Sequence, residues 1–211
     1  MILSELVSGN EDHPAYWALE VANGVRHYSF LESVVEAALA VNRPLLSQTV
    51  IKAINYHAIA CLHPYTGDYR PCPVIVGDYE PPDHYRVAAL MDDFVDRVNR
   101  YWDTASDEVH LAAYVLWRLN WIHPFINGNG RTARASCYFV ICLKMGGWLP
   151  GKTILPELLR QPQYRQRYVL ALRHADETSL SGETDLSLMY SLLMELLDQQ
   201  LSSIPADAPY Q

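Results

Sequence analysis

The order of apolar and polar residues along the chain is dominated by one period. Apolar residues recur three or four positions apart through most of the sequence, which is the spacing of an α-helix that turns one face toward a core. Ser47, Asp83 and Asp107 are suited to cap three such helices. The pattern predicts an all-α fold, a compact bundle of about six to eight helices. The clearest predicted helices cover residues 28–41, 48–61, 83–101, 107–121, 131–145, 156–175 and 185–201.

One segment departs from this period. Residues 73–76, Pro-Val-Ile-Val, are followed by a Gly-Asp pair, a sequence typical of a short β-strand and a turn. The apolar side chains of this strand are Val74, Ile75 and Val76. An exposed strand edge can pair with an extended segment of another protein, but it can also be a simple surface hairpin. The residues alone leave both interpretations open.

The chain divides into three parts by pattern. Its 211 residues, half of them hydrophobic, are enough for one domain with a well-buried core. We expect residues 1–40 to form an N-terminal segment that packs on this core, with a loop and a short helix over residues 1–26. Residues 41–201 form the main domain in this prediction. Residues 202–211 contain two prolines and no periodicity, which predicts a frayed tail.

Charge and cysteine content indicate which partners and which cellular compartment to expect. The net charge is −8, from 24 acidic and 16 basic residues, which argues against attraction to nucleic acid or to an anionic membrane surface. The four cysteines show no metal-site spacing, and two of them fall within an apolar helix. No signal peptide is evident, and no apolar run reaches the ~20 residues that span a bilayer. We therefore expect a cytoplasmic protein with reduced cysteines.

The most informative stretch is residues 123–134, His-Pro-Phe-Ile-Asn-Gly-Asn-Gly-Arg-Thr-Ala-Arg, between two predicted helices. Pro124 and the glycines break the backbone hydrogen bonds, so the second helix is expected to begin near Gly130. A Gly-Asn-Gly loop that leads into a helix leaves backbone N–H groups unpaired beside the positive end of the helix dipole. This arrangement predicts an anion pocket suited to phosphate.

Three side chains add chemistry to the pocket. Arg131 and Arg134 lie three positions apart, so they project from one face of the first turn and extend the pocket toward a polyphosphate. His123, at the other end of the loop, can accept a proton near neutral pH. Each feature alone is more often structural: a bonded histidine, a common turn, a solvated arginine pair. Their occurrence within twelve residues favours a site that transfers a phosphate-bearing group to a hydroxyl.

The stretch resembles the signature of the Fic family, His-x-Phe-x-Asp/Glu-Gly-Asn-Gly-Arg-x-x-Arg. Residues 65–70, Tyr-Thr-Gly-Asp-Tyr-Arg, are similar to the element that precedes the family's short hairpin, called the flap. The resemblance implies that residues 41–201 are a Fic domain, an all-α Fic-type bundle with one short β-hairpin. The signature residues present are His123, Phe125, Gly128, Asn129, Gly130, Arg131 and Arg134.

Family members typically move the AMP part of ATP to a Ser, Thr or Tyr hydroxyl of a target protein. The resemblance therefore implies a protein adenylyltransferase that uses ATP as its substrate. His123 would be the base that deprotonates the target hydroxyl, and Phe125 would anchor the loop in the core. The flap residues Val74, Ile75 and Val76 would dock the protein target. The implied phosphate-binding residues are Gly128, Asn129 and Gly130 as the anion hole, with Arg131 and Arg134 on the β- and γ-phosphates.

Asn127 is the departure from the signature, because the family has an acidic residue there. Magnesium prefers carboxylate oxygens and substrate phosphates, and an asparagine offers an oxygen without the charge. We expect a weakened Mg²⁺ site, nucleotide binding that persists, and AMP transfer that is weak or atypical. The alternatives are a Fic-fold enzyme with another phosphate-containing donor, a nucleotide- or partner-binding protein with little turnover, and a plain helical interaction domain.

Many family members also carry an inhibitory helix, Ser/Thr-x-x-x-Glu-Gly/Asn, whose glutamate pairs with the second signature arginine. Residues 179–183 and 191–195 match it in part, and Glu195 is the better placed of the two glutamates. We expect His57 to be a structural helix residue. Residues 168–176 resemble a pattern common downstream of the family's loop, with a packing role or a role beside the base or ribose.

Overall fold

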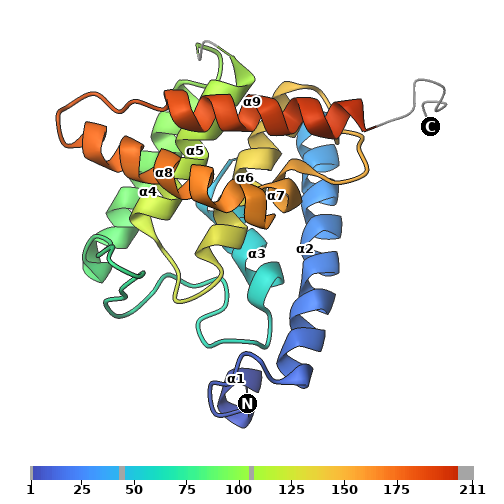
Figure 1. Cartoon of the computed structure of the whole chain (residues 1–211), viewed down its shortest axis with the longest axis vertical. Helices are drawn as coiled ribbons and strands as arrows, with labels where there is room; N and C mark the ends of the chain where they lie inside the picture. Colours follow the sequence, from blue (N-terminus) through green and yellow to red (C-terminus); the bar gives the residue numbers. More distant parts are fainter. Residues whose placement is uncertain (1, 43–45, 105–106, 204–211) are drawn as a thin grey trace.

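The computed structural model describes residues 2–42, 46–104 and 107–203, and these residues form a helical bundle (Figure 1). The expected all-α fold is confirmed. The predicted tail lies mostly in residues 204–211, outside the described residues. In chain order the helices are α1 Leu3–Leu6, α2 Pro14–Ala40, α3 Gln48–Ile59, the 3₁₀ turn η1 His84–Arg86, α4 Val87–Arg100, α5 Glu108–Ile122, α6 Asn129–Lys144, α7 Leu155–Leu158, α8 Pro162–Ser179 and α9 Ser187–Ser202.

Helix α6 lies at the centre of the bundle. It contacts α2, α3, α5 and α7, while α8 and α9 cover α5 from the other side (Figure 1). Its side chains from Ala135 to Cys142 are all buried, so the helix is surrounded by other elements. A helix that is apolar nearly all round is stable only in such a position. The signature loop therefore joins the two most deeply packed helices, which fix both of its ends.

Helix caps explain where several helices begin. Ser47 Oγ accepts from the N–H of Val50 at 3.2 Å, and Asp107 Oδ1 accepts from the N–H of His110 at 2.7 Å, as the sequence predicts. Asp83 does not cap a helix with its side chain; a 3₁₀ turn intervenes before α4. Residues 156–175 are two helices, not one, because Pro162 begins the second.

The expectation of a loop and a short helix over residues 1–26 is wrong for its second half. Helix α2 begins at Pro14, where proline is favoured in the first turn, and continues for 27 residues. Its buried face includes Asn23 and His27 beside Tyr16 and Leu31. Polar residues at core-facing positions hide the helical period, which explains why the sequence pattern missed this helix.

The predicted hairpin is much reduced. Val76 and Tyr79 form a single antiparallel bridge with two hydrogen bonds of 2.9 and 3.0 Å, and the described residues contain no longer strand. Pro81 and Pro82 follow the turn and have no N–H to donate, so the pairing cannot extend. The segment is an exposed turn on an extended stretch.

The N-terminal residues are attached to the end of α3. The N–H groups of Leu3 and Ser4 donate to the carbonyls of Cys61 and Leu62 at 2.9 and 3.1 Å. Tyr16 belongs to a small buried cluster with Ala58, Ile59 and Leu62. No helix in the described ranges is long and apolar enough to cross a membrane.

Asn55, a fully buried residue of α3, connects the signature loop to the rest of the fold. Its Nδ2 donates to the carbonyl of Asn127 at 3.0 Å and to Thr132 Oγ1 at 3.2 Å, and its Oδ1 accepts from the N–H of Gly67 at 3.0 Å. All three bonds close contacts between segments far apart in sequence. Asn55 therefore sets the position of the loop.

Asn55→Ala should destabilise the protein by about 2 kcal/mol, because it leaves partly buried backbone groups of Gly67 and Asn127 without the partner that Asn55 provides. Urea unfolding followed by circular dichroism measures this loss. Asn10→Ala is the control, since Asn10 is exposed and makes one local bond to Asp12; a change within about 0.5 kcal/mol is expected there. Equal effects of the two variants would contradict the role given to Asn55.

Candidate active site

His123 ends α5 in the left-handed conformation, with φ 50°. Its N–H donates to the carbonyl of Leu119 at 3.0 Å, and its carbonyl accepts from Nε of the buried Arg70 at 2.8 Å. Arg70 also donates to the carbonyls of Cys72 and Pro82. One guanidinium thus connects the end of α5 to both ends of the segment that carries the turn at 76–79.

The loop after His123 closes on itself. Asn129 Oδ1 accepts from the N–H of Phe125 at 2.9 Å, and its Nδ2 donates to the carbonyl of the same residue at 2.8 Å. The ring of Phe125 is fully buried and lies 5.7 Å from that of Tyr69. Phe125 sits where an anchor is expected. The side chain of Asn129 is occupied in the loop, so its backbone N–H is the group left for an anion.

Two glycines open the start of α6. Gly128 has φ +77°, and a Cβ there would lie 2.8 Å from Ile59 Cγ2. A Cβ on Gly130 would lie 3.2 Å from Arg134 Nη1. The first bonded N–H of the helix is that of Thr132, which donates to the carbonyl of Gly128 at 2.9 Å. The N–H groups of Asn129, Gly130 and Arg131 precede it and have no partner within the helix.

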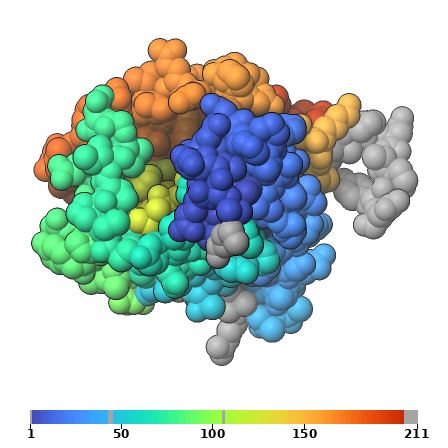
Figure 2. Space-filling model, turned by 90° about the horizontal axis from the view of Figure 1, so that it is seen from below, coloured from blue at the N-terminus to red at the C-terminus, as the bar shows by residue number. Residues whose placement is uncertain are grey.

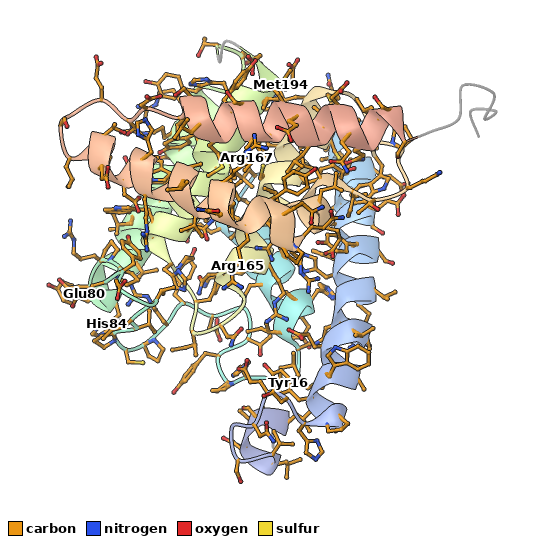
Figure 3. The ribbon with its side chains drawn as sticks, in the orientation of Figure 1. Tyr16, Glu80, His84, Arg165, Arg167 and Met194 are labelled. Atoms are coloured by element: carbon orange, nitrogen blue, oxygen red, sulfur yellow. The ribbon has the colours of Figure 1, made fainter. Side chains whose placement is uncertain are left out.

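The loop begins at His123, which forms part of the wall of a hollow. Figure 2 shows the yellow surface of this segment between the green flap region, the orange C-terminal helices and the blue N-terminal helices. A cavity of about 820 Å³ is lined by the turn, the end of α5 and one face of α8. Figure 3 shows Arg165 on the side of α8 that faces the loop, whereas Arg167 lies toward α9. Lining side chains include Val76, Tyr79, His123, Arg165, Val169 and Asp176.

His123 lines this cavity and is neutral near pH 7. Burial, the larger cause, and the positive charge of Arg70 lower the pKa of His123 to about 4, against a partial opposing effect of the Asn120 carbonyl. A neutral imidazole beside a cavity can take up a proton from a bound hydroxyl. Tyr79 keeps the turn close to it, because the Tyr79 hydroxyl donates to the carbonyl of Trp121 at 2.6 Å.

The two signature arginines differ in their surroundings. Arg131 Nη1 donates to Glu20 Oε1 on α2 at 2.9 Å, which is an ion pair, and to the carbonyl of Ala58 at 3.3 Å. The Nε of Arg134 is buried and has no hydrogen-bond partner in the described part of the chain. Arg134 is thus the signature arginine that forms no ion pair with a carboxylate among the described residues.

Glu195, the better placed of the two partly matching glutamates, does not pair with Arg134. Glu195 forms a bidentate pair with Arg167 at 3.0 and 2.7 Å on the exposed side of α8 and α9. The carboxylate that reaches the signature is Glu20, and it binds Arg131. Glu20 lies 111 positions from Arg131, and no local pattern marks it.

The flap residues are only partly accessible for docking. Ile75 is 77% exposed and Val76 41% exposed, whereas Val74 is half-buried. Their backbone is extended before the turn, and Val76 also lines the cavity beside His123. An incoming chain could reach this edge from solvent. His57, which we expected to be structural, stacks on Phe30 with ring centres 4.2 Å apart.

The residues around Asn127 do not fit the magnesium ion that the resemblance implies. Its Oδ1 accepts from Arg131 Nη2 at 3.1 Å, and its Nδ2 lies 2.9 Å from His63 Nε2. The oxygen is therefore bound to a cationic side chain, and the other end of the amide carries hydrogens. Among the described residues no group of three His, Cys, Asp or Glu side chains is arranged to hold a metal.

Sequence reasoning missed several residues of this region. The sequence pattern included Asp176 but gave it no contact. In the structure Asp176 lines the cavity and accepts a hydrogen bond from Trp117 Nε1 at 2.7 Å, and burial raises the pKa of its carboxyl group. Sequence reasoning gave no role to His63, Glu20 or Tyr79. The apolar neighbours of Tyr79 and the short strand signal marked its segment, but nothing in the sequence marked the other two.

Comparison with known proteins agrees with the signature. A family model described as Fic/DOC family matches residues 45–141. The chain is 35% identical over 111 residues to the protein adenylyltransferase Fic of Drosophila willistoni, a match that covers 53% of this chain and 20% of that protein. The chain therefore spans about a fifth of the length of the curated relatives it matches, of which the protein of Drosophila persimilis is another at 35% identity.

Solved structures share the fold. A Fic family protein from Desulfovibrio desulfuricans G20 superposes with a TM-score of 0.66 at 21% identity, covering 90% of this chain and 53% of that one. A Fic domain containing signaling protein from Bacteroides thetaiotaomicron VPI-5482 gives 0.65 at 24% identity, covering 86% and 69%. The loop between α5 and α6, the bundle that holds it and these similarities agree: the chain carries a domain of the Fic/DOC family.

Proposed function

We propose that this chain is a protein adenylyltransferase that moves AMP from ATP to a Ser, Thr or Tyr hydroxyl of a target protein. The observation that carries the proposal is the position of His123, a neutral imidazole in the wall of the cavity and at one end of a loop. The other end of that loop presents free N–H groups and two arginines. The relatives named protein adenylyltransferase support the same reaction class.

The proposed reaction needs only positioning, charge and one base. The target hydroxyl oxygen bonds to the α-phosphorus of ATP, and the bond from that phosphorus to the oxygen of the β-phosphate breaks. The hydroxyl proton passes to the free ring nitrogen of His123, and pyrophosphate leaves. The N–H groups of Asn129 and Gly130 face the phosphates, and Arg131 and Arg134 bind the terminal ones.

The flap segment would hold the target. An extended stretch of the target can pair with the exposed edge at Ile75 and Val76, which brings its hydroxyl toward His123. The nucleoside would lie in the cavity between this turn and α8. Val169 and Leu172 offer an apolar surface there, and Asp176 a polar group.

A second candidate is a nucleotide-binding member of the family with little turnover. Two observations favour it: the amide of Asn127 in place of an acid, and Arg131 held by Glu20. Calorimetry with ATP together with a search for added AMP separates the two. Binding without any modified protein in a lysate supports the second, whereas an AMP-modified target supports the first. A panel of labelled donors tests another phosphate-containing substrate.

His123→Ala should lower AMP transfer at least ~10²-fold while ATP binding persists, because the variant loses the base and keeps the phosphate contacts. Label transfer from α-³²P-ATP to lysate proteins measures the rate. His110→Ala, an exposed histidine on the same helix, is the matched control and should transfer AMP at the original rate. Undiminished transfer by His123→Ala would rule out the assigned base.

As the pH is lowered, kcat/KM for AMP transfer should fall with a midpoint near pH 4 and not near 6.5. The base must be neutral, and burial holds the pKa of His123 at about 4, so lowering the pH from 8 to 5 should leave the neutral form in place. Initial rates across this range in constant ionic strength test it, with circular dichroism at each pH to confirm folding. A fall of the rate centred near 6.5 would show that His123 titrates as an exposed histidine.

Glu20→Gln should strengthen ATP binding by about three- to tenfold, because the carboxylate no longer competes with phosphate for Arg131. Calorimetry measures the dissociation constant. Glu32→Gln, an exposed glutamate further along the same helix, controls for the change of net charge. An unchanged or weaker affinity in Glu20→Gln alone would mean that the ion pair helps to shape the site.

A further inference from the structure

Asn127 is part of a chain of polar contacts. Arg131 Nη2 donates to Asn127 Oδ1, and Asn127 Nδ2 lies 2.9 Å from His63 Nε2. The Tyr16 hydroxyl lies 2.7 Å from the same nitrogen. Glu20, four positions after Tyr16 on α2, binds Nη1 of the same guanidinium and is not linked to Tyr16. We call Tyr16, His63, Asn127 and Arg131 the α2 clamp.

The chemistry of arginine fixes the direction of these bonds. A guanidinium only donates, so the Asn127 oxygen must face Arg131 and its NH₂ group must face His63. His63 Nε2 must then accept, which places the ring proton on Nδ1 and leaves the imidazole neutral. Burial, the largest cause, lowers the pKa of His63 and outweighs the opposing charge of Glu11, whose Oε1 lies 3.2 Å from Nε2, which agrees with a neutral ring.

An acidic residue at position 127 could not make both of these hydrogen bonds. Its second oxygen would face the lone pair of His63 Nε2, and two acceptors repel unless the ring takes up a proton there. Asparagine is the residue whose oxygen and NH₂ group match Arg131 on one side and a neutral His63 on the other.

The clamp joins three parts of the chain that are distant in sequence. Tyr16 is 2% exposed, and Figure 3 shows it at the foot of α2, near α1. His63 follows α3, and Asn127 and Arg131 flank the start of α6. The clamp therefore ties the N-terminal segment to the loop and holds Nη2 of the Arg131 guanidinium.

We propose that Asn127 is not a metal ligand in this protein but a positioning residue, which with His63 orients Arg131 toward the phosphates and fastens the loop to α2. The phosphate role of Arg131 rests on the proposed function. The disagreement with a magnesium site rests on the contacts of Asn127 alone. Nucleotide affinity should then depend on Asn127 and His63 whether or not magnesium is present.

The test is calorimetry with ATP, in MgCl₂ and separately in EDTA, on the full chain and four variants. Asn127→Ala and His63→Ala should each weaken ATP binding three- to tenfold, by the same factor in both buffers. The double variant should bind ATP no more weakly than either single variant, because each change breaks the same chain of contacts. His63→Gln should bind as the original protein does, since its amide oxygen can accept from Asn127.

A metal-ligand role makes the opposite prediction. Asn127→Ala would weaken ATP binding in MgCl₂ only, and His63→Ala would change nothing. That pair of results overturns the proposal. Thermal unfolding of each variant shows whether it is folded at the temperature of the titration.

If ATP does not bind the original protein, the proposed function fails, and two further measurements still decide on the clamp. The fall in Tm should be smaller in the double variant than the sum of the two single falls. The ¹⁵N shift of His63 Nε2 should be that of an unprotonated nitrogen near pH 7. Additive falls in Tm or a protonated Nε2 would overturn the clamp. His57→Ala, on α3 and outside the clamp, is the control.

Discussion

Helix α6 begins inside the protein, and the need to satisfy its first N–H groups constrains the whole site. A buried peptide group without a partner is costly, so nearly every polar group around this helix start has one. Asn129 binds Phe125, Asn55 binds the carbonyl of Asn127, and Arg70 binds the carbonyl of His123. Donors at the first turn are left over. The fold thus has a surplus of N–H groups at one place, which is an arrangement suited to bind an anion.

Electrostatics strengthens the same conclusion. Cations are unfavourable at the positive end of a helix, yet Arg131 and Arg134 stand in the first two turns of α6. Glu20 balances Arg131, while Arg134 has a buried Nε without a partner in the described ranges. An acidic protein of net charge −8 thus carries these two positive charges three positions apart at one helix start. A bound anion would relieve the repulsion between them and the helix dipole.

The sequence predicted those helices whose ends and buried face depend on residues close together in the chain. Helices with a clear period and a side-chain cap, such as α3 and α5, lie where the pattern placed them. The first half of α2 was missed because the polar residues Asn23 and His27 occupy its inner face. Asn23 donates to the carbonyl of Ala60, and His27 is buried against other helices, neither of which the local sequence shows. The twelve-residue loop could be interpreted because its chemistry is contiguous. The partners of Asn127 and Arg131 could not be predicted in this way, because His63 lies 64 positions from Asn127 and Glu20 lies 111 positions from Arg131.

These long-range partners change what the family resemblance means for this chain. The matched region, residues 45–141, contains the loop and both signature arginines, but Tyr16 and Glu20 lie before it. The arginine that would hold a phosphate is therefore oriented by a helix outside the matched region. The same signature in a different N-terminal setting would have a free Arg131 and an untied residue at position 127. Similarity in the loop thus supports the proposed reaction class, whereas the contacts of Arg131 and Asn127 depend on α2 and on His63, which follows α3.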